Sequence, residues 1–228
     1  MSRKTSSLIT ILLATMISPL TSSAAEPQAV FSWDAQTFVP PLYEGHVLAN
    51  DATPIWVALA VIENQKFADL NNQNIKWFVD GAPYREGVGS SSIIISPEFT
   101  KPPVATVSVL IEKYRGATTS LAATTTIPII APLVRAEAPY PNRGVAIGII
   151  ELRALPYFFT ASSLSDFTFE WTANDTPGTL SKSQGDPSDA NLFLLTIQES
   201  LRGRMARIAV GAVSNGIRAS DTLNLSIQ

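Results

Sequence analysis

Two tryptophan-centred segments constrain the fold of this chain more than any other feature. The first spans residues 74–81 and the second spans residues 167–175. In each, apolar and polar residues alternate around a central tryptophan, Trp77 or Trp171, and a polar turn follows. A period of two places the apolar side chains on one face of a strand that is buried on that face. The sequence therefore predicts two core strands, each at the centre of its own small β-sandwich, with Trp77 and Trp171 as core residues.

The residues before the two tryptophan segments also repeat. An apolar run at 54–62 precedes Trp77, and a second run at 156–161 precedes Trp171. This alignment matches Trp56 with Tyr157 and predicts a core role for both. A unit this long that occurs twice indicates a tandem duplication, because a solenoid needs three or more short units.

The rest of the chain is rich in short, β-branched runs separated by Gly, Pro and polar turns. Further strands are predicted at residues 92–96, 104–112, 121–129, 133–137, 192–197, 204–214 and 222–227. No segment carries the 10-to-15-residue apolar stripe of an amphipathic helix, which excludes βαβ alternation. About seven short strands per ~100 residues fit an immunoglobulin-like sandwich. The predicted fold is all-β, with two tandem immunoglobulin-like sandwiches at residues 26–130 and 131–228 joined stiffly by a short connection.

The N-terminus has the pattern of a secretory signal peptide. Arg3 and Lys4 precede an apolar run at residues 8–20, and Ser23-Ala24-Ala25 provides small residues for cleavage. An uncleaved anchor is the alternative, but the run is shorter than the roughly 20 residues that a bilayer span needs. We therefore expect a signal peptide at residues 1–25 and a secreted or cell-surface protein without a transmembrane segment in the mature chain.

The composition of the chain narrows the classes of partner that we expect. The chain has no cysteine, so disulfides contribute nothing to its stability. Its formal charge of −3 becomes more negative when Arg3 and Lys4 are removed, and no basic stripe is present to attract phosphates. Nucleic acid is therefore not an expected partner. No cofactor is expected either.

Several motifs in the sequence together resemble those of a known class of domain. They are the Trp77-Phe78-Val79-Asp80-Gly81 strand, the entry segment at residues 38–45, the run at 156–159, and Trp171. This set resembles the immunoglobulin-like domains, including PKD-type modules, that occur in tandem in exported and surface proteins of bacteria. The resemblance covers most of the mature chain and implies a sandwich fold and a surface location. It transfers no catalytic residue, and such scaffolds serve adhesion, spacing, carbohydrate binding and assembly alike.

The sequence offers little for catalysis. His46 is the single histidine, and neither a cysteine nucleophile nor a Gly-x-Ser-x-Gly motif accompanies it. Zinc sites draw on several Cys or His ligands, so zinc is disfavoured. Asp175, Asp186 and Asp189 are weak calcium candidates, because they lack the regular spacing and closing glutamate of a calcium loop. The sequence thus predicts a protein that is not an enzyme.

Tyrosines near Pro and Gly are the better candidates for exposed contacts. Tyr43, Tyr84 and Tyr140 are expected either to contact a partner or a glycan, or to pack over their own turns. The Thr-rich segment at 121–127 is predicted to be an edge strand that offers β-augmentation to a protein partner. The expected function is adhesion or assembly at the cell surface or envelope through protein contacts. The alternatives are a carbohydrate-binding module and a hydrolase, which would need a cleft with convergent carboxylates.

Overall fold

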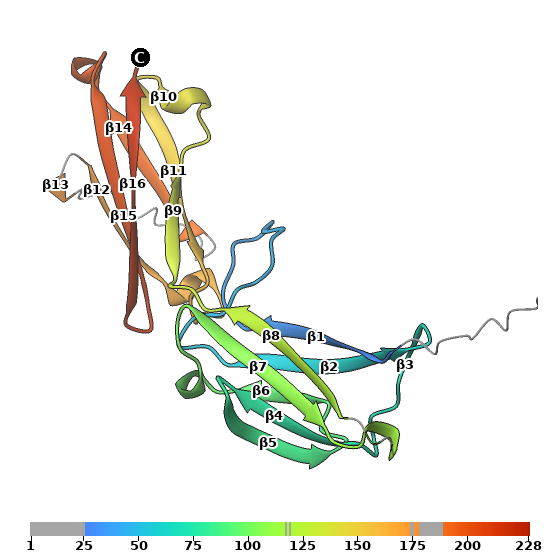
Figure 1. The fold of residues 1–228 in the computed structure, drawn as a ribbon. Coiled ribbons are helices and arrows are strands. Elements are labelled where there is room, and N and C mark those ends of the chain that lie inside the picture. The colour runs from blue at the N-terminus through green and yellow to red at the C-terminus, as the bar shows by residue number, and fades with distance from the viewer. Residues whose placement is uncertain (1–25, 117, 119, 174–175, 178–188) are drawn as a thin grey trace, which may run out of the picture.

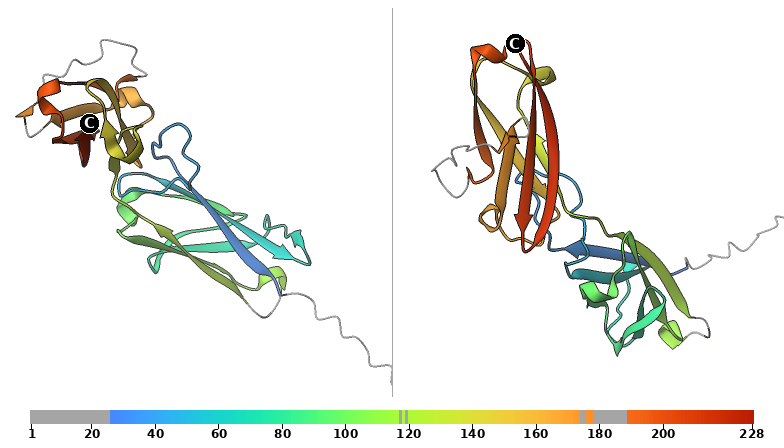
Figure 2. Two further views of the ribbon diagram at one scale, coloured as in Figure 1. Left: turned by 90° about the horizontal axis from the view of Figure 1, so that it is seen from above. Right: turned by 90° about the vertical axis from the view of Figure 1, so that its left-hand side faces the viewer.

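The computed structural model describes residues 26–116, 118, 120–173, 176–177 and 189–228. The predicted signal peptide and the calcium candidates Asp175 and Asp186 lie outside these residues. In the described part the chain forms β-strands and short 3-10 helices, and it contains no α-helix. The strands make two sandwiches that follow one another end to end (Figure 1 and Figure 2).

The first sandwich has two four-stranded antiparallel sheets. One sheet contains β1 (Gln28–Ala35), β2 (Ile55–Glu63), β3 (Lys66–Phe67) and β6 (Ser92–Ile95). The other has the order β5 (Ala82–Val88), β4 (Asn74–Val79), β7 (Val104–Ile111) and β8 (Leu121–Pro128). Strand β2 is central, because it pairs with β1 on one side and with β6 and β3 on the other.

The second sandwich has a five-stranded and a three-stranded sheet. The larger has the order β10 (Gly144–Val145), β16 (Ile217–Ile227), β15 (Met205–Ser214), β12 (Thr168–Ala173) and β13 (Thr176–Pro177). The smaller has the order β14 (Leu192–Ile197), β11 (Gly148–Tyr157) and β9 (Leu133–Glu137). Short 3-10 helices lie in the connections: η1 (Pro97–Phe99), η2 (Tyr114–Gly116), η3 (Pro141–Arg143), η4 (Leu164–Asp166) and η6 (Glu199–Leu201).

Both sandwiches use the same strand order. Strands β1, β2 and β6 face β5, β4, β7 and β8, as β9, β11 and β14 face β13, β12, β15 and β16. This is the arrangement of an immunoglobulin-like sandwich, so the predicted all-β tandem fold is confirmed. The chain passes from one sandwich to the other between Pro128 and Leu133, the segment in which the sequence predicts the domain boundary.

The two tryptophans differ in burial. Trp77 is 1% exposed and lies in a continuous core between the sheets of the first sandwich, where its Nε1 donates to the Ser90 carbonyl over 2.7 Å. Trp171 is half-buried and stacks on Phe193 with ring centroids 4.6 Å apart. The buried apolar residues of the second sandwich form two clusters, and Trp171 packs against both. The second sandwich therefore has the more divided core.

The structure corrects the alignment of the two repeats. The second strand of the second sandwich, β11, begins at Gly148 rather than at Pro156, so Trp56 lies near the start of β2 whereas Tyr157 ends β11. In β2 the odd-numbered side chains point into the core, and Trp56 is 46% exposed on the outer face. The predicted core role of Trp56 is therefore wrong. Tyr157 is half-buried, and desolvation by burial, followed by the nearby Glu137 charge, raises its pKa.

The sequence does not predict strand β5, nor the two-residue strands β3, β10 and β13. Residues 82–88 have the Gly and Pro content of a connection, yet they form β5 at the edge of the second sheet. The pairing of β5 with β4 shifts between Trp77 and Phe78, which marks a bulge or similar irregularity. An edge strand tolerates Pro83 because it needs hydrogen bonds on one side only.

Candidate functional site

Residues 36–54, called here the junction loop, connect β1 to β2 and reach the second sandwich on the way (Figure 1). The Phe38 amide donates to the Phe159 carbonyl over 2.7 Å, and the Phe158 amide donates to the Phe38 carbonyl over 2.6 Å. At the other end of the loop, the Ile130 amide donates to the Ala49 carbonyl over 2.9 Å. Backbone bonds therefore attach the loop both to the second sandwich and to the segment that links the two.

Asn50 is the polar centre of the junction. It is fully buried, and its Nδ2 donates to the Phe158 carbonyl over 2.7 Å and to Thr160 Oγ1 over 3.2 Å. Its Oδ1 accepts from the Ala52 amide over 2.8 Å and from Thr53 Oγ1 over 2.6 Å. A buried amide with both ends bonded fixes its neighbours, because breaking the set leaves polar atoms without water or partner. Asn50 thus locks the loop to the second sandwich.

Phe158 shows how closely the two sandwiches are fitted. Its φ of 61° lies in the left-handed region, which a bulky residue adopts at a cost of about 1–3 kcal/mol. The junction loop binds both of its backbone polar groups, through Phe38 and Asn50. Its side chain is 5% exposed. The contacts with the first sandwich hold this residue in its strained conformation.

Tyr43 adds an aromatic contact to the junction. Its ring meets Tyr157 and Phe158 edge-on, with centroid distances of 5.7 and 5.8 Å, and its hydroxyl donates to the His46 carbonyl over 3.1 Å. A Cβ on Gly45 would collide with the outer end of the Tyr43 ring, so a larger residue at this position would displace the ring. Tyr43 is half-buried between the sandwiches, and it packs over its own turn as well.

The other singled-out aromatic and histidine side chains also have partners within the protein. Tyr84 Oη donates to the Ile94 carbonyl over 2.6 Å, at the free side of β6. Tyr140 Oη accepts from the Glu151 amide over 2.9 Å. His46 is exposed, and its ring lies edge-on to Trp33 at 4.1 Å. In each of these two tyrosines the hydroxyl bonds the backbone of another strand, β6 for Tyr84 and β11 for Tyr140.

A cavity of about 570 Å³ lies between the sandwiches beside the Asn50 network. Gln36, Thr53 and Pro54 line it from the first sandwich. Thr160, Ala161, Ser162, Asp166 and Asn215 line it from the second. Backbone hydrogen bonds from Ser162 and then Ser163 lower the pKa of Asp166, so this carboxylate is a fixed acceptor at neutral pH. Sequence reasoning did not single out any of these lining residues, because they come together only when the junction forms.

The two edges of the sheet β5-β4-β7-β8 in the first sandwich differ strongly. At one edge, β5 carries Pro83, Arg85 and Glu86 and the irregular pairing with β4. At the other edge, β8 runs for eight residues without a charge, and within the described residues it pairs with β7 alone. Proteins usually blunt such edges with charges, prolines or bulges. Strand β8 has none of these between Leu121 and Ile127.

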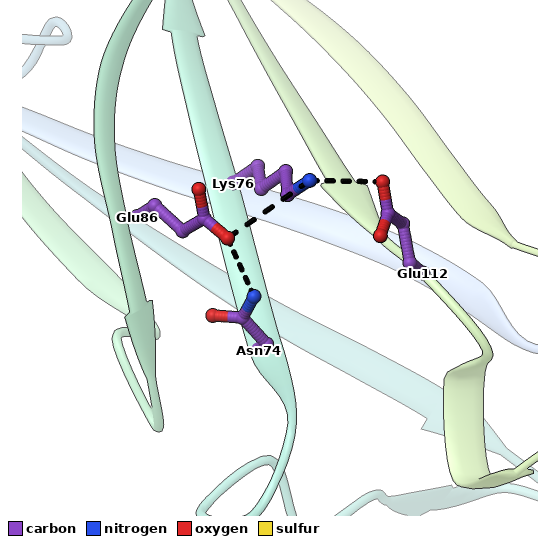
Figure 3. Close-up of polar contacts among 4 residues, drawn as sticks. All are labelled: Asn74, Lys76, Glu86 and Glu112. Carbon is purple, nitrogen blue, oxygen red and sulfur yellow. Dashed lines mark hydrogen bonds and ion pairs between the residues drawn. The ribbon is translucent and has the colours of Figure 1, made fainter.

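The outer face of the same sheet carries a small charged cluster on β4, β5 and the turn after β7 (Figure 3). Lys76 Nζ lies 2.9 Å from Glu112 Oε1 and 3.9 Å from Glu86 Oε1. Glu86 also accepts from Asn74 Nδ2 over 2.6 Å. The hydrogen bond to Glu112 is the largest cause that raises the pKa of Lys76. These groups satisfy one another, so the cluster has the features of an ordinary solvated face rather than of a binding site.

The described residues also bear on the predicted calcium candidates and on the expected absence of a transmembrane segment. Asp189 lies 3.6 Å from Arg153 in an ion pair, and the other calcium candidates are outside the described residues. In the described part of the chain, no three His, Cys, Asp or Glu side chains gather closely enough to hold a metal ion. No helix among these residues has the length and hydropathy needed to cross a membrane.

Comparisons with known proteins give matches in structure alone. No protein-family model matches the sequence, and no curated protein does. The three N-terminal domains of the highly immunogenic outer capsid protein of bacteriophage RB49 are similar at a TM-score of 0.44 and 10% identity, over 88% of this chain and 59% of that chain. The fibronectin(III)-like modules of Clostridium thermocellum CbhA match at 0.30 and 8%, over 84% and 94%. The Bacteroides ovatus protein SGBP-B, in complex with a mixed-linkage heptasaccharide, matches at 0.25 and 15%, over 86% and 47%.

Proposed function

We propose that this chain is a non-enzymatic, exported protein that binds a protein partner along β8 in an assembly at the cell surface or envelope. The partner adds a strand to the open edge of the sheet β5-β4-β7-β8. The observation that carries the proposal is the uncharged edge of β8, which pairs with β7 alone among the described residues, in contrast to the protected edge of β5 on the opposite side of the sheet. The signal-peptide pattern at residues 1–25 supports export.

The residues of β8 suit strand addition. Its outward side chains are Ala122, Thr124 and Thr126, which are small and exposed. Threonine has a high β-propensity, and small side chains let a second backbone approach closely. Main-chain hydrogen bonds would supply affinity, and the side chains on alternate positions would supply specificity.

The junction fixes the orientation of this binding edge relative to the second sandwich. Asn50 and the backbone bonds of Phe38 hold the second sandwich at one orientation to the first. A partner bound to β8 would therefore be held at a fixed position relative to the second sandwich. This suits a protein that spaces or orients other components. Carbohydrate binding is a second candidate function, favoured by the exposed Trp56.

The test compares two single substitutions to lysine, at positions whose side chains lie on the same face of the sheet. Thr126 on the edge strand pairs directly with Thr106 on β7, which is paired on both sides. A photo-crosslinking side chain at Ala122 is introduced in cells that make the protein, alone or combined with Thr126→Lys or Thr106→Lys. We expect a discrete protein adduct that Thr126→Lys abolishes and Thr106→Lys leaves unchanged.

Two controls make the result decisive. Thermal unfolding of both lysine variants must show that the fold is retained, since Thr126 is exposed and Thr106 is half-buried. An adduct that both lysines weaken equally would indicate binding to the face of the sheet and would overturn strand addition. The lack of any adduct at Ala122 would also overturn it.

A further inference from the structure

The cavity at the junction has the size and lining of a small polar binding site. Its volume of about 570 Å³ falls in the range of small-molecule sites, roughly 300–1,000 Å³. Both sandwiches contribute walls, Gln36 and Thr53 from one and Ser162 and Asn215 from the other. The site therefore exists only in the joined arrangement.

The polar groups that line the cavity are neutral, with one exception. They are the amides of Gln36 and Asn215 and the hydroxyls of Thr53, Thr160 and Ser162, together with the carboxylate of Asp166. Amides and hydroxyls each donate and accept hydrogen bonds, and a carboxylate accepts strongly. No lysine or arginine lines the cavity among the described residues, so an anion such as phosphate lacks a counter-charge. This lining matches a neutral ligand rich in hydroxyl groups.

The walls are already positioned by bonds within the protein. Thr53 Oγ1 donates to Asn50, and Asn215 Nδ2 donates to the Thr160 carbonyl over 2.6 Å. Asp166 accepts from the Ser162 amide over 2.8 Å. Groups held in this way lose little freedom when a ligand binds, which favours affinity.

An exposed aromatic residue, Trp56, follows two positions after Pro54, which lines this cavity. Pro54 lines the cavity, Ile55 points into the core, and Trp56 points outward again. Side chains two positions apart on a strand share a face and lie about 6.6 Å apart. The Trp56 indole is 46% exposed, so a flat apolar face is available beside the polar cavity. The axial C–H groups of a sugar ring pack on such a face, while its hydroxyls need the polar partners that the cavity supplies.

We propose that the junction cavity and Trp56 together bind a neutral oligosaccharide. One sugar unit occupies the cavity, where Gln36, Ser162 and Asp166 receive its hydroxyls, and the next unit stacks on Trp56. This site is separate from the β8 edge, so it adds a function to the proposed protein contact. Failure of either test leaves the other unaffected, because the two sites share no residue.

The experiment titrates the purified chain with neutral tetrasaccharides built from glucose, mannose or N-acetylglucosamine, and with a sulfated tetrasaccharide as the charged comparison. Binding is measured by calorimetry and by the NMR signal of the Trp56 indole N–H. We expect at least one neutral probe to bind and to shift this signal. Trp56→Ala should weaken binding about tenfold or more, equivalent to about 1.4 kcal/mol, and Gln36→Ala should weaken it less.

Phe67 provides the matched control. It is 80% exposed and pairs with Ile62, so it lies on the same outer face as Trp56 at the far end of β2. Phe67→Ala should leave binding unchanged. The proposal is overturned if no neutral probe shifts the Trp56 signal at millimolar concentration, if Trp56→Ala binds as tightly as the parent chain, or if only the sulfated probe binds.

Discussion

The two sandwiches share a strand order but use the connection after their first strand differently. In the first, residues 36–54 leave β1, bind the second sandwich and return to β2. In the second, residues 138–147 make the same connection, and β10 within it pairs in parallel with β16. One copy of the repeat thus uses this segment to join its neighbour, and the other uses it to cover its own sheet.

The edge strands reflect this difference. β16 carries β10 along part of its edge, and its Asp221 accepts a hydrogen bond from the Ala136 amide over 2.9 Å. Within the residues that the structure describes, β8 pairs with β7 alone, and its other edge has no partner strand. The isolated bridge between Ala49 and Ile129 lies beyond the end of β8. Because open edges promote pairing with other chains, a protein keeps one only where it is useful or otherwise harmless. The comparison therefore directs attention to the first sandwich as the binding copy.

The largest expected difference between the copies concerns their tryptophans. Trp77→Ala should destabilise the first sandwich by about 3–5 kcal/mol, because it removes a fully buried ring and leaves the Ser90 carbonyl without its donor. Trp171→Ala should cost the second sandwich about half as much, since Trp171 is half-buried. Urea unfolding followed by NMR resolves the signals of each sandwich.

A conservative variant separates packing from hydrogen bonding in this test. Trp77→Phe keeps an aromatic ring in the core but removes the indole donor, so its cost should lie well below that of Trp77→Ala. Equal losses from Trp77→Ala and Trp171→Ala would show that the two cores are equivalent and would contradict the distinction drawn from their burial.

The next largest effect tests the junction. Asn50→Ala should cost about 1–3 kcal/mol and release the second sandwich from its fixed orientation, because the Phe158 carbonyl and Thr160 lose their partner. Asn191 is the control, since it is 4% exposed and its Nδ2 donates to the Ala154 carbonyl within the second sandwich. Asn191→Ala should lower stability without a change of orientation. Residual dipolar couplings measure the orientation, and an unchanged value in Asn50→Ala would refute the locking role.

A smaller effect concerns the stability of the chain at low pH, through Asp166, which lines the cavity from the second sandwich. Two backbone amides hold the pKa of Asp166 below its ordinary value of 3.8, so this group stabilises the folded chain above that pH. The contribution is lost as the pH falls through the lowered pKa, and Asp166→Asn should be insensitive to the same change. NMR titration of the Asp166 carboxyl carbon checks the direction, and a midpoint above 3.8 would contradict it.

Local patterns allowed most of the strands to be predicted. Alternation around Trp77 and β-branched runs such as residues 192–197 report burial on one face, which depends on neighbours in sequence. Such patterns do not reveal β5, because an edge strand can contain Pro and Gly. The core role predicted for Trp56 is wrong because the alignment matches a run that covers nearly all of β2 with a run whose first two residues, Pro156 and Tyr157, end β11.

The contacts at the junction between the two sandwiches could not be predicted from such local patterns. Asn50 and Thr160 are far apart in the sequence, and each is an unremarkable polar residue in a loop. The unequal lengths of the connections after the first strands are the signal that was available. In contrast, the edge position of residues 121–127 was predicted correctly, because a Thr-rich uncharged strand at the end of a sandwich repeat has a local signature.

The smallest expected effect concerns the charged outer faces. Lys76 bonds Glu112 in the first sandwich, and Arg218 bonds Glu170 in the second. Exposed pairs contribute little to stability and are screened by salt. We therefore expect Lys76→Gln and Arg218→Gln to shift the urea midpoint slightly at low salt and not measurably at high salt. The raised pKa of Lys76 means that its contribution is present below its ordinary value of 10.5 and is lost as the pH rises through the raised value. A large shift of the urea midpoint in Lys76→Gln that does not depend on salt would contradict this expectation and would show that the cluster stabilises the fold.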